Sequence, residues 1–350
     1  MNEVINAEHS LLVDAVQQFL DGEGLAVTGR TGALDATDAA ALWRDCARMG
    51  WTLACVPEEC DGVGLPLPVV ASMVEEMGKR LLPLPVADAT AINALLHRGV
   101  EQCDGADALR DRLAGWLGGD ALLAIVRGAG AGSGRPFAEF ATPGIPALDL
   151  SWAEGMLTVT AVATEAHGHG VDPLIPVGLP ADGAPAWRHE VPCGANAWQA
   201  FCGLRRALRL GELLGVGAQA LALASAHARE REQFGKPIGI NQAVKHRLAD
   251  NWMALDNARL VLQDACGLLD EAGWHSPAGR DAEAALLTAV LLVTEAAHAS
   301  TAQAIQTHGA MGITWECPVH FFLKRARHLG AILAHDGDET AMLDRLWALG

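Results

Sequence analysis

Two long stretches near the C-terminal end carry apolar residues at steps of three and four, the spacing of an amphipathic helix. These residues are Leu213, Val216, Ala220 and Leu223 in the first stretch, and Val244, Leu248, Trp252 and Leu255 in the second. A third stretch is expected to begin at Ser276-Pro277, an N-cap residue followed by a first-turn proline, and to end at Gly309. Long helices that each bury one stripe must pack side by side, so we predict a C-terminal four-helix bundle.

The rest of the chain divides into a helical and a β-like part. Shorter amphipathic runs occupy the first third, at about 8–20, 38–50, 67–81, 86–98 and 105–117. Between 119 and 194 the pattern changes to short apolar runs broken by glycine and proline, at 121–126, 156–162 and 174–177. We therefore predict a mainly α protein with a small β domain: a helical domain at 1–118, a β domain at 119–194 and the bundle at 195–350.

Composition narrows the classes of partner. The chain has 350 residues, of which 51% are hydrophobic and 19% charged, which is enough apolar material for more than one core. Its net charge of −17 would repel nucleic acid and anionic lipid, so neither is expected as a partner. The N-terminus lacks a basic region followed by an apolar run, and no later stretch looks long and charge-free enough to span a bilayer. We therefore expect a cytoplasmic protein.

The cysteines do not predict a metal site. There are eight, and they form neither a CxxC pair nor a zinc-ligand spacing. We interpret them as small buried hydrophobic residues, and we expect no disulfide framework and no metal.

Two segments carry a resemblance to a known family. Residues 229–238 read REREQFGKPI, and residues 306–316 read QTHGAMGITWE. In this order, with amphipathic stretches around them, they resemble the two signature segments of the acyl-CoA dehydrogenase flavoproteins. The N-terminal part is also similar to the family: Pro57-Glu58-Glu59 is followed by two spaced glycines and a helix with paired glutamates.

The resemblance implies a fold, a cofactor and a chemistry. Family members enclose FAD and an acyl-CoA between an N-terminal helical domain, a middle β-barrel, expected here in shortened form, and a C-terminal four-helix bundle. A carboxylate removes the α-proton while the β-hydrogen leaves as hydride to the flavin. By resemblance, Arg231, Gln233 and Phe234 reach across a subunit interface to the FAD diphosphate, for which a forked guanidinium is chemically suited. Gln306 and Gly309 would contact the adenosine half of FAD.

The positions of the family's catalytic base hold no acid. Counting from Arg325-Ala326-Arg327, the usual glutamate position falls on Leu333. The alternative position, early in the first bundle helix, falls on Arg205. Neither side chain can act as a carboxylate base. The middle region also lacks the family's Thr-Glu-x-x-x-Gly-Ser-Asp loop around the flavin ring.

These departures lead to a primary hypothesis. Residues 315–326 are most similar to short acyl-CoA dehydrogenases built from two different subunits, including those of bacterial steroid side-chain breakdown. The chain would be one such subunit, without its own base, that completes the FAD site of a second acyl-CoA dehydrogenase subunit. The substrate would be an acyl-CoA thioester, and the expected electron acceptor is an electron-transfer flavoprotein.

Two alternatives remain open. The chain could be a self-sufficient homo-oligomeric dehydrogenase whose base is displaced, to Glu212, two helical turns beyond Arg205, or to Asp336, one turn beyond Leu333. It could also be a structural paralogue that binds no flavin.

Overall fold

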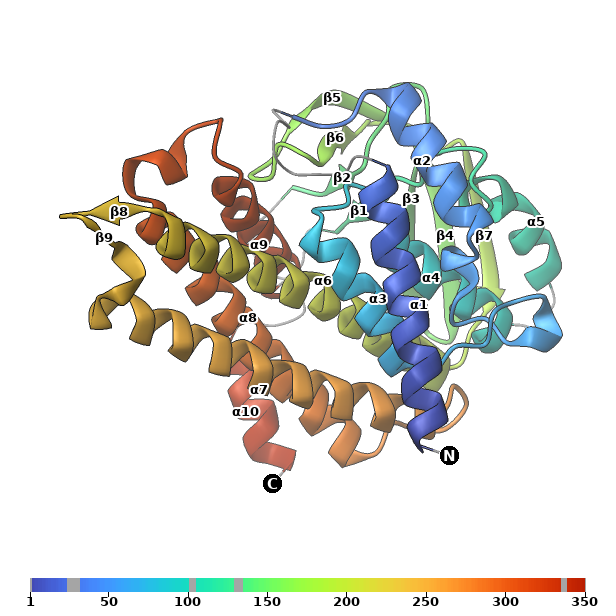
Figure 1. Cartoon of the computed structure of the whole chain (residues 1–350). Coiled ribbons are helices and arrows are strands. Elements are labelled where there is room, and N and C mark those ends of the chain that lie inside the picture. The colour runs from blue at the N-terminus through green and yellow to red at the C-terminus, as the bar shows by residue number, and fades with distance from the viewer. Residues whose placement is uncertain (1, 24–31, 101–104, 129–134, 335–338, 350) are drawn as a thin grey trace.

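The protein is described by a computed structural model in which N-terminal helices, a β-sheet and a C-terminal helical bundle follow one another along the chain (Figure 1). The structure describes residues 2–23, 32–100, 105–128, 135–334 and 339–349. The predicted fold class, mainly α with a small β domain, is confirmed.

The N-terminal helices lie close to the predicted amphipathic runs. They are α1 (Asn2–Gly22), α2 (Ala36–Arg48), α3 (Leu67–Lys79), α4 (Val86–Ala94) and α5 (Ala106–Leu117), with the short helical turns η1 (Trp51–Leu53), η2 (Glu58–Cys60) and η3 (Leu95–Gly99). Helix α2 begins at its predicted place because the Asp35 carboxylate accepts hydrogen bonds from the backbone of Thr37 and Asp38, both at 2.8 Å. Helix α4 is buried at every position.

The middle of the chain forms one seven-stranded sheet. Its strands are β1 (Ile125–Arg127), β2 (Phe137–Glu139), β3 (Ala147–Ala153), β4 (Met156–Val162), β5 (Thr164–His169), β6 (Pro176–Pro180) and β7 (Trp187–Pro192). They pair in the order β5-β6-β2-β1-β3-β4-β7, and only β1 and β3 run parallel. This single run of strands is the half-barrel form of the predicted β domain.

The C-terminal part contains the four predicted long helices. They are α6 (Ala195–Glu230), α7 (Gln242–Ala272), α8 (Arg280–His308) and α9 (Val319–Ala334), joined in part by η4 (Ile238–Ile240) and η5 (Gly309–Ile313). A further helix that the sequence did not indicate, α10 (Glu339–Leu349), packs on α8.

The predicted start of the third long helix was wrong. Helix α8 begins at Arg280 after Gly279, not at Ser276-Pro277. The Asn196 side-chain amide donates a hydrogen bond to the carbonyl of His275 at 3.0 Å, which ties this loop to the start of α6. The helix therefore begins only after the chain has left that contact.

Glycines bring α3 and α6 into backbone contact. A Cβ on Gly215 would lie 1.9 Å from the carbonyl oxygen of Glu75, and a Cβ on Gly78 would lie 2.1 Å from that of Glu212. No side chain fits at either position without moving a helix. The close approach fixes the middle of α6 against the N-terminal helices, which positions the functional residues that α6 carries.

The expectation that no stretch is long and apolar enough to span a bilayer was wrong for two bundle helices. By length and composition, α6 and the stretch from Arg280 to Ile313 are both apolar enough to do so. The most apolar window of each is 78% and 50% buried inside the protein, respectively. Their apolar character is thus accounted for largely by packing in the bundle.

Candidate active site

The first signature segment forms an exposed hairpin at the end of α6. Arg231 is the C-cap of that helix, and the chain then forms β8 (Glu232–Gln233) and β9 (Lys236–Pro237). The turn holds Phe234 and Gly235 at φ of 55° and 74°. Arg231 and Gln233 are exposed, and Phe234 is 102% exposed, at the tip of a hairpin that extends beyond the bundle (Figure 1). An aromatic ring presented in this way is available to another molecule.

The second signature segment lies at the same end of the bundle. Gln306 is exposed on the last turn of α8, and Gly309 ends that helix at φ of 63° with open space where a Cβ would be. The imidazole rings of His227 on α6 and His308 on α8 stack at 4.2 Å between centroids. Burial, then the nearby His308 and Arg231, lowers the pKa of His227. The stack joins the two helix ends that carry the signature segments.

The second signature segment also contains Trp315 and His308, which differ in their exposure. Trp315 is 53% exposed and carries the Lys324 ammonium 4.9 Å from its ring centroid, so it is not a core tryptophan. His308 is half-buried, and its Nδ1 lies 2.8 Å from the carbonyl oxygen of Ala304.

The two expected positions of the base meet in one cavity. Arg205 on α6 and Leu333 on α9 both line a cavity of about 370 Å³ between the bundle and strands β1 and β3. Leu333 is buried, and the Arg205 guanidinium lies 5.2 Å from the ring centroid of Phe201. The cavity thus brings together the leucine and the arginine that stand at the two positions where the resemblance placed the base.

Of the two displaced bases that the sequence suggested, Glu212 is not among the described residues that line the cavity. Glu212 is 9% exposed, and its carboxylate accepts from Arg325 at 2.8 Å and from Arg209 at 3.3 Å. Both of its interactions with guanidiniums are therefore inside the protein. Asp336 lies outside the described residues.

A carboxylate that sequence reasoning missed does line the cavity. Asp149 on β3 is the one acidic residue among the described residues of the lining. Burial raises its pKa, and it makes no hydrogen bond with the described part of the chain. A single aspartate on a short strand carries no sequence signal, and only the strand pairing brings it to the cavity.

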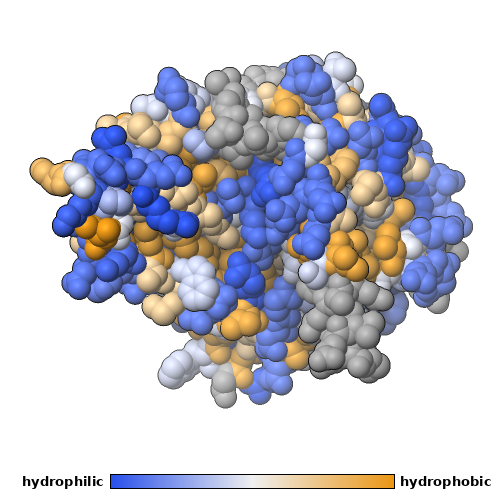
Figure 2. Space-filling model, in the orientation of Figure 1, coloured by the Kyte–Doolittle hydropathy of each residue, from blue (hydrophilic) through white to orange (hydrophobic). Residues whose placement is uncertain are grey.

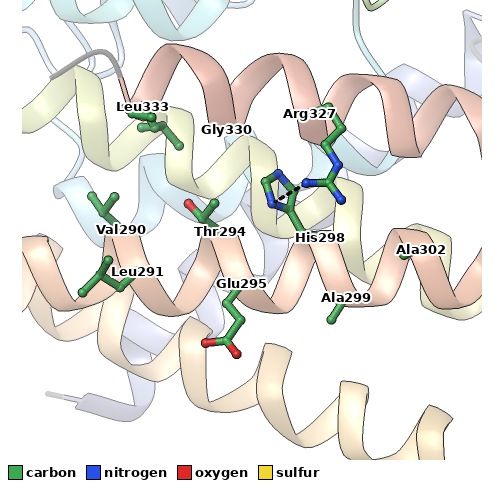
Figure 3. Close-up of a pocket in the computed structure, with 11 residues that line it drawn as sticks. Val290, Leu291, Thr294, Glu295, His298, Ala299, Ala302, Arg327, Gly330 and Leu333 are labelled. Atoms are coloured by element: carbon green, nitrogen blue, oxygen red, sulfur yellow. Dashed lines mark hydrogen bonds between the residues drawn. The ribbon is translucent and has the colours of Figure 1, made fainter. Parts of the chain in front are cut away.

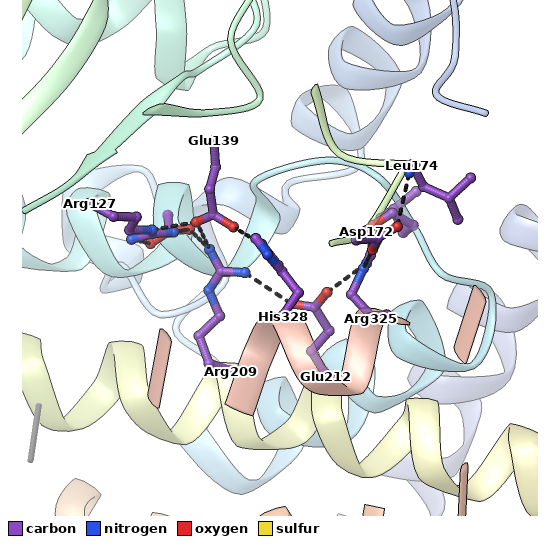
Figure 4. Close-up of polar contacts among 10 residues, drawn as sticks. Arg127, Glu139, Asp172, Leu174, Arg209, Glu212, Arg325 and His328 are labelled. Carbon is purple, nitrogen blue, oxygen red and sulfur yellow. Dashed lines mark hydrogen bonds and ion pairs between the residues drawn. The ribbon is translucent and has the colours of Figure 1, made fainter. Parts of the chain in front are cut away.

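A buried charge network reaches the cavity through Arg127 and Arg209, which line it. Figure 4 shows the contacts of the network. Arg127 donates to Asp88 at 2.8 Å and also to Glu139, and Arg209 donates to both of these carboxylates. His328 Nε2 lies 2.6 Å from Glu139 Oε1. Burial opposes ionisation of Asp88 and Glu139, but Arg127 and Arg209 outweigh it and lower the pKa of both carboxyl groups.

The network continues from Arg209 through Glu212 to Arg325 on α9. Arg325 is fully buried and donates to Glu212 at 2.8 Å and to Asp172, whose carboxylate also accepts from the backbone of Leu174 at 2.9 Å. The charges come from α4, the sheet region, α6 and α9. They join all three parts of the fold.

The exposed signature residues fit FAD by their donor chemistry. A guanidinium at Arg231 and amides at Gln233 and Gln306 can donate to a diphosphate or a nucleotide. The open space around Gly309 would allow a cofactor to approach the backbone. When bound, FAD supplies the hydride acceptor.

The comparisons with known proteins agree with this geometry. The model of the acyl-CoA dehydrogenase N-terminal domain matches residues 6–103, and that of the C-terminal domain matches 194–333. The acyl-CoA dehydrogenase IpdE2 of Mycobacterium tuberculosis is 29% identical over 304 residues, covering 83% of this chain and 82% of its own length.

Two solved structures have the same fold. The ChsE4-ChsE5 complex from Mycobacterium tuberculosis superposes with a TM-score of 0.74 at 21% identity, covering 97% of this chain and 96% of the matched chain. The FAD complex of PigA superposes with a TM-score of 0.69 at 18% identity, covering 97% of each chain. The chain belongs to the acyl-CoA dehydrogenase family, whose members are FAD-dependent oxidoreductases of acyl-CoA thioesters.

Proposed function

We propose that this chain is one subunit of a heteromeric acyl-CoA dehydrogenase, and that it completes the FAD site of a partner subunit that supplies the catalytic base. Arg231, Gln233 and Phe234 would bind the cofactor from the hairpin, and Gln306 and Gly309 from the end of α8. The division of the chain into three domains, with boundaries after residues 118 and 194, is part of the same proposal.

The exposure of the signature residues carries the proposal. All five lie on one exposed end of the bundle, and Phe234 projects its whole ring into solvent. Residues that served a cofactor in their own chain's cavity would be expected to line that cavity. None of the five is among the described residues around Leu333 and Arg205.

The chain's own cavity supports the same conclusion. Arg127 and Arg209 line it and are held by Asp88 and Glu139, so ion pairs fill the place where the sheet meets the bundle. Removing these groups to admit a flavin ring would leave buried charges unpaired, which is costly. The partner's cavity is therefore the better place for the flavin ring.

The relatives suggest the wider context. IpdE2 is an acyl-CoA dehydrogenase, and ChsE4-ChsE5 is a complex of two named proteins. Because residues 315–326 resemble the two-subunit dehydrogenases of bacterial steroid side-chain breakdown, we propose an acyl-CoA with a steroid-derived acyl group as substrate. We also propose an electron-transfer flavoprotein as acceptor and the cytoplasm as location.

The test is the visible absorption spectrum of the chain purified alone and after co-expression with a second acyl-CoA dehydrogenase subunit. We expect flavin bands, and their bleaching by acyl-CoA, only in the complex, with one FAD per pair of subunits. Arg231→Gln should weaken FAD binding about tenfold or more, because it removes a charge-assisted hydrogen bond. The matched control Arg188→Gln, an exposed arginine on β7, should bind FAD normally.

The displaced-base alternative makes the opposite prediction. Flavin bands and bleaching in the chain alone would overturn the proposal. In that case Asp149→Asn and Glu212→Gln would show which carboxylate removes the proton, because each keeps its side-chain shape and loses the charge. A colourless complex with full subunit pairing would favour the structural paralogue.

A further inference from the structure

Two histidines join the helix ends that carry the signature segments. The imidazole rings of His227 and His308 stack with 4.2 Å between their centroids and 22° between their planes. His227 lies in the last turn of α6 and His308 in the last turn of α8, and both residues are half-buried. The stack is therefore a direct side-chain contact between the two ends.

Arg231 follows His227 at the end of the same helix. The Arg231 backbone N–H donates to the carbonyl oxygen of His227 at 2.8 Å, at the C-cap of α6. Figure 2 shows hydrophilic residues gathered over this end of the bundle, around the hairpin. The exposed Arg231 therefore stands one helical turn from the stack, at a surface that an anion can reach.

Three charged or titratable groups act on the His227 ring. Burial, then His308 on α8 and Arg231 on its own helix, lowers the pKa of His227, while Glu230 acts in the opposite direction. A histidine whose pKa lies below the ordinary value of about 6.5 is neutral at pH 7. In the chain without a bound anion, His227 is thus a neutral partner in the stack.

An anion bound at Arg231 would reverse this balance. The positive charge of Arg231 opposes a proton on His227. A diphosphate held by the guanidinium offsets that charge and adds negative charge near the ring, so it favours the protonated form. One added proton leaves a cation against a neutral ring, whereas a second would place two cations 4.2 Å apart. The pair is therefore suited to hold a single proton.

We infer that His227 is a positioning residue at the cofactor-binding end, and that it takes up one proton from solvent when an anionic cofactor binds at Arg231. The inference rests on the proposed function, in which Arg231 binds the FAD diphosphate. Because linkage is reciprocal, a ligand whose binding takes up a proton binds more tightly as pH falls. The stack would thereby make cofactor retention in the complex depend on pH.

Calorimetric titration of FAD into the cofactor-stripped complex of the two subunits tests the inference. Titrations near pH 6.5, in two buffers with different enthalpies of protonation, give the number of protons taken up per FAD bound. We expect about half to one proton. The Kd should also fall about three- to tenfold between pH 8 and pH 6, the effect of one neighbouring charge at a partly exposed site. Neither measurement requires turnover.

Two variants locate the proton. His227→Gln keeps a polar side chain that does not titrate, so it should bind FAD without proton uptake and with a Kd that no longer changes with pH. The matched control is His298→Gln, since burial and Arg327 also lower the pKa of His298, whose Nδ1 lies 3.4 Å from Arg327 Nη1 (Figure 3). It should keep the wild-type proton uptake, because about 15 Å of helix separates it from His308.

Two results would overturn the inference alone: FAD binding without proton uptake in the wild-type complex, which requires no variant, and uptake that persists in His227→Gln. Loss of uptake in His298→Gln as well would also overturn it, because the effect would not be specific to the stack. A complex that binds no FAD, or binds it unchanged in Arg231→Gln, would overturn the proposed function and the inference with it.

Discussion

Replacing Glu139 by glutamine should destabilise the protein severely. Glu139 is fully buried and accepts from Arg127, from Arg209 at 3.2 Å and from His328 at 2.6 Å. Glutamine keeps the shape but removes the charge, and its amide nitrogen is a donor that would face other donors. Breaking one side of a buried ion network typically costs about 3–5 kcal/mol. Glu190→Gln breaks the exposed pair with Arg188, so it should cost about 1 kcal/mol or less.

The effect of Glu139→Gln should depend on pH in a defined direction. Burial alone would raise the pKa of Glu139, but Arg127 and Arg209 outweigh burial and hold it well below its ordinary value. A carboxyl whose pKa is lower in the folded than in the unfolded state, about 4.3 for glutamate, stabilises the fold above that value. The contribution is lost as pH falls through the folded pKa. The difference between wild type and variant should thus be full at pH 7 and should shrink in acid.

Urea unfolding followed by tryptophan fluorescence measures this difference, because the chain has ten tryptophans. Wild type, Glu139→Gln and Glu190→Gln would be compared at pH 7 and at several acidic pH values. Equal midpoints for the two variants at pH 7 would refute the network as a source of stability. A cost of Glu139→Gln that stayed constant on acidification would refute its electrostatic origin.

Two further predictions concern packing. Gly215→Ala should lower the free energy of unfolding by about 3 kcal/mol, because its Cβ would lie 1.9 Å from the Glu75 carbonyl oxygen. The control Gly267→Ala, on α7 with open space around it, should be neutral or slightly stabilising. Urea titration of the two variants measures the difference. Burial raises the pKa of Cys55 to about 12, so its thiol should resist iodoacetamide at pH 8 in the folded protein and should react in urea. Mass spectrometry detects the modification. Modification of Cys55 in the folded protein would contradict its burial.

The helices could be predicted because their signal is local. The stripes at steps of three and four gave α6 and α7, and the runs in the first third gave α1 to α5. Strands β2, β3, β5 and β7 lie outside the predicted runs, since the prediction used continuous apolar runs and none of these strands is one. The start of α8 was placed too early because the tie between Asn196 and His275 is a tertiary contact.

The site was predictable only where a motif marks it. Counting along the family pattern selected Arg205 and Leu333, which lie in one cavity although 128 positions separate them in the chain. The network could not be foreseen, because its partners are distant in sequence: 39 residues separate Arg127 from Asp88, and 189 separate His328 from Glu139. Asp149 was missed for the same reason.

Helix α6 connects the cavity that contains Arg205 with the hairpin that contains Arg231, where we propose that the cofactor binds. It carries Arg205 and Arg209 near its start and Arg231 at its C-cap, and its middle is fixed to α3 by Gly215. The interval from Arg209 to Arg231 corresponds to about 33 Å of helix. Over that distance, side-chain changes in the cavity leave the hairpin where it is, provided the helix stays rigid. The buried network and the glycine contact supply that rigidity, so a substitution in the cavity should leave the position of the hairpin unchanged.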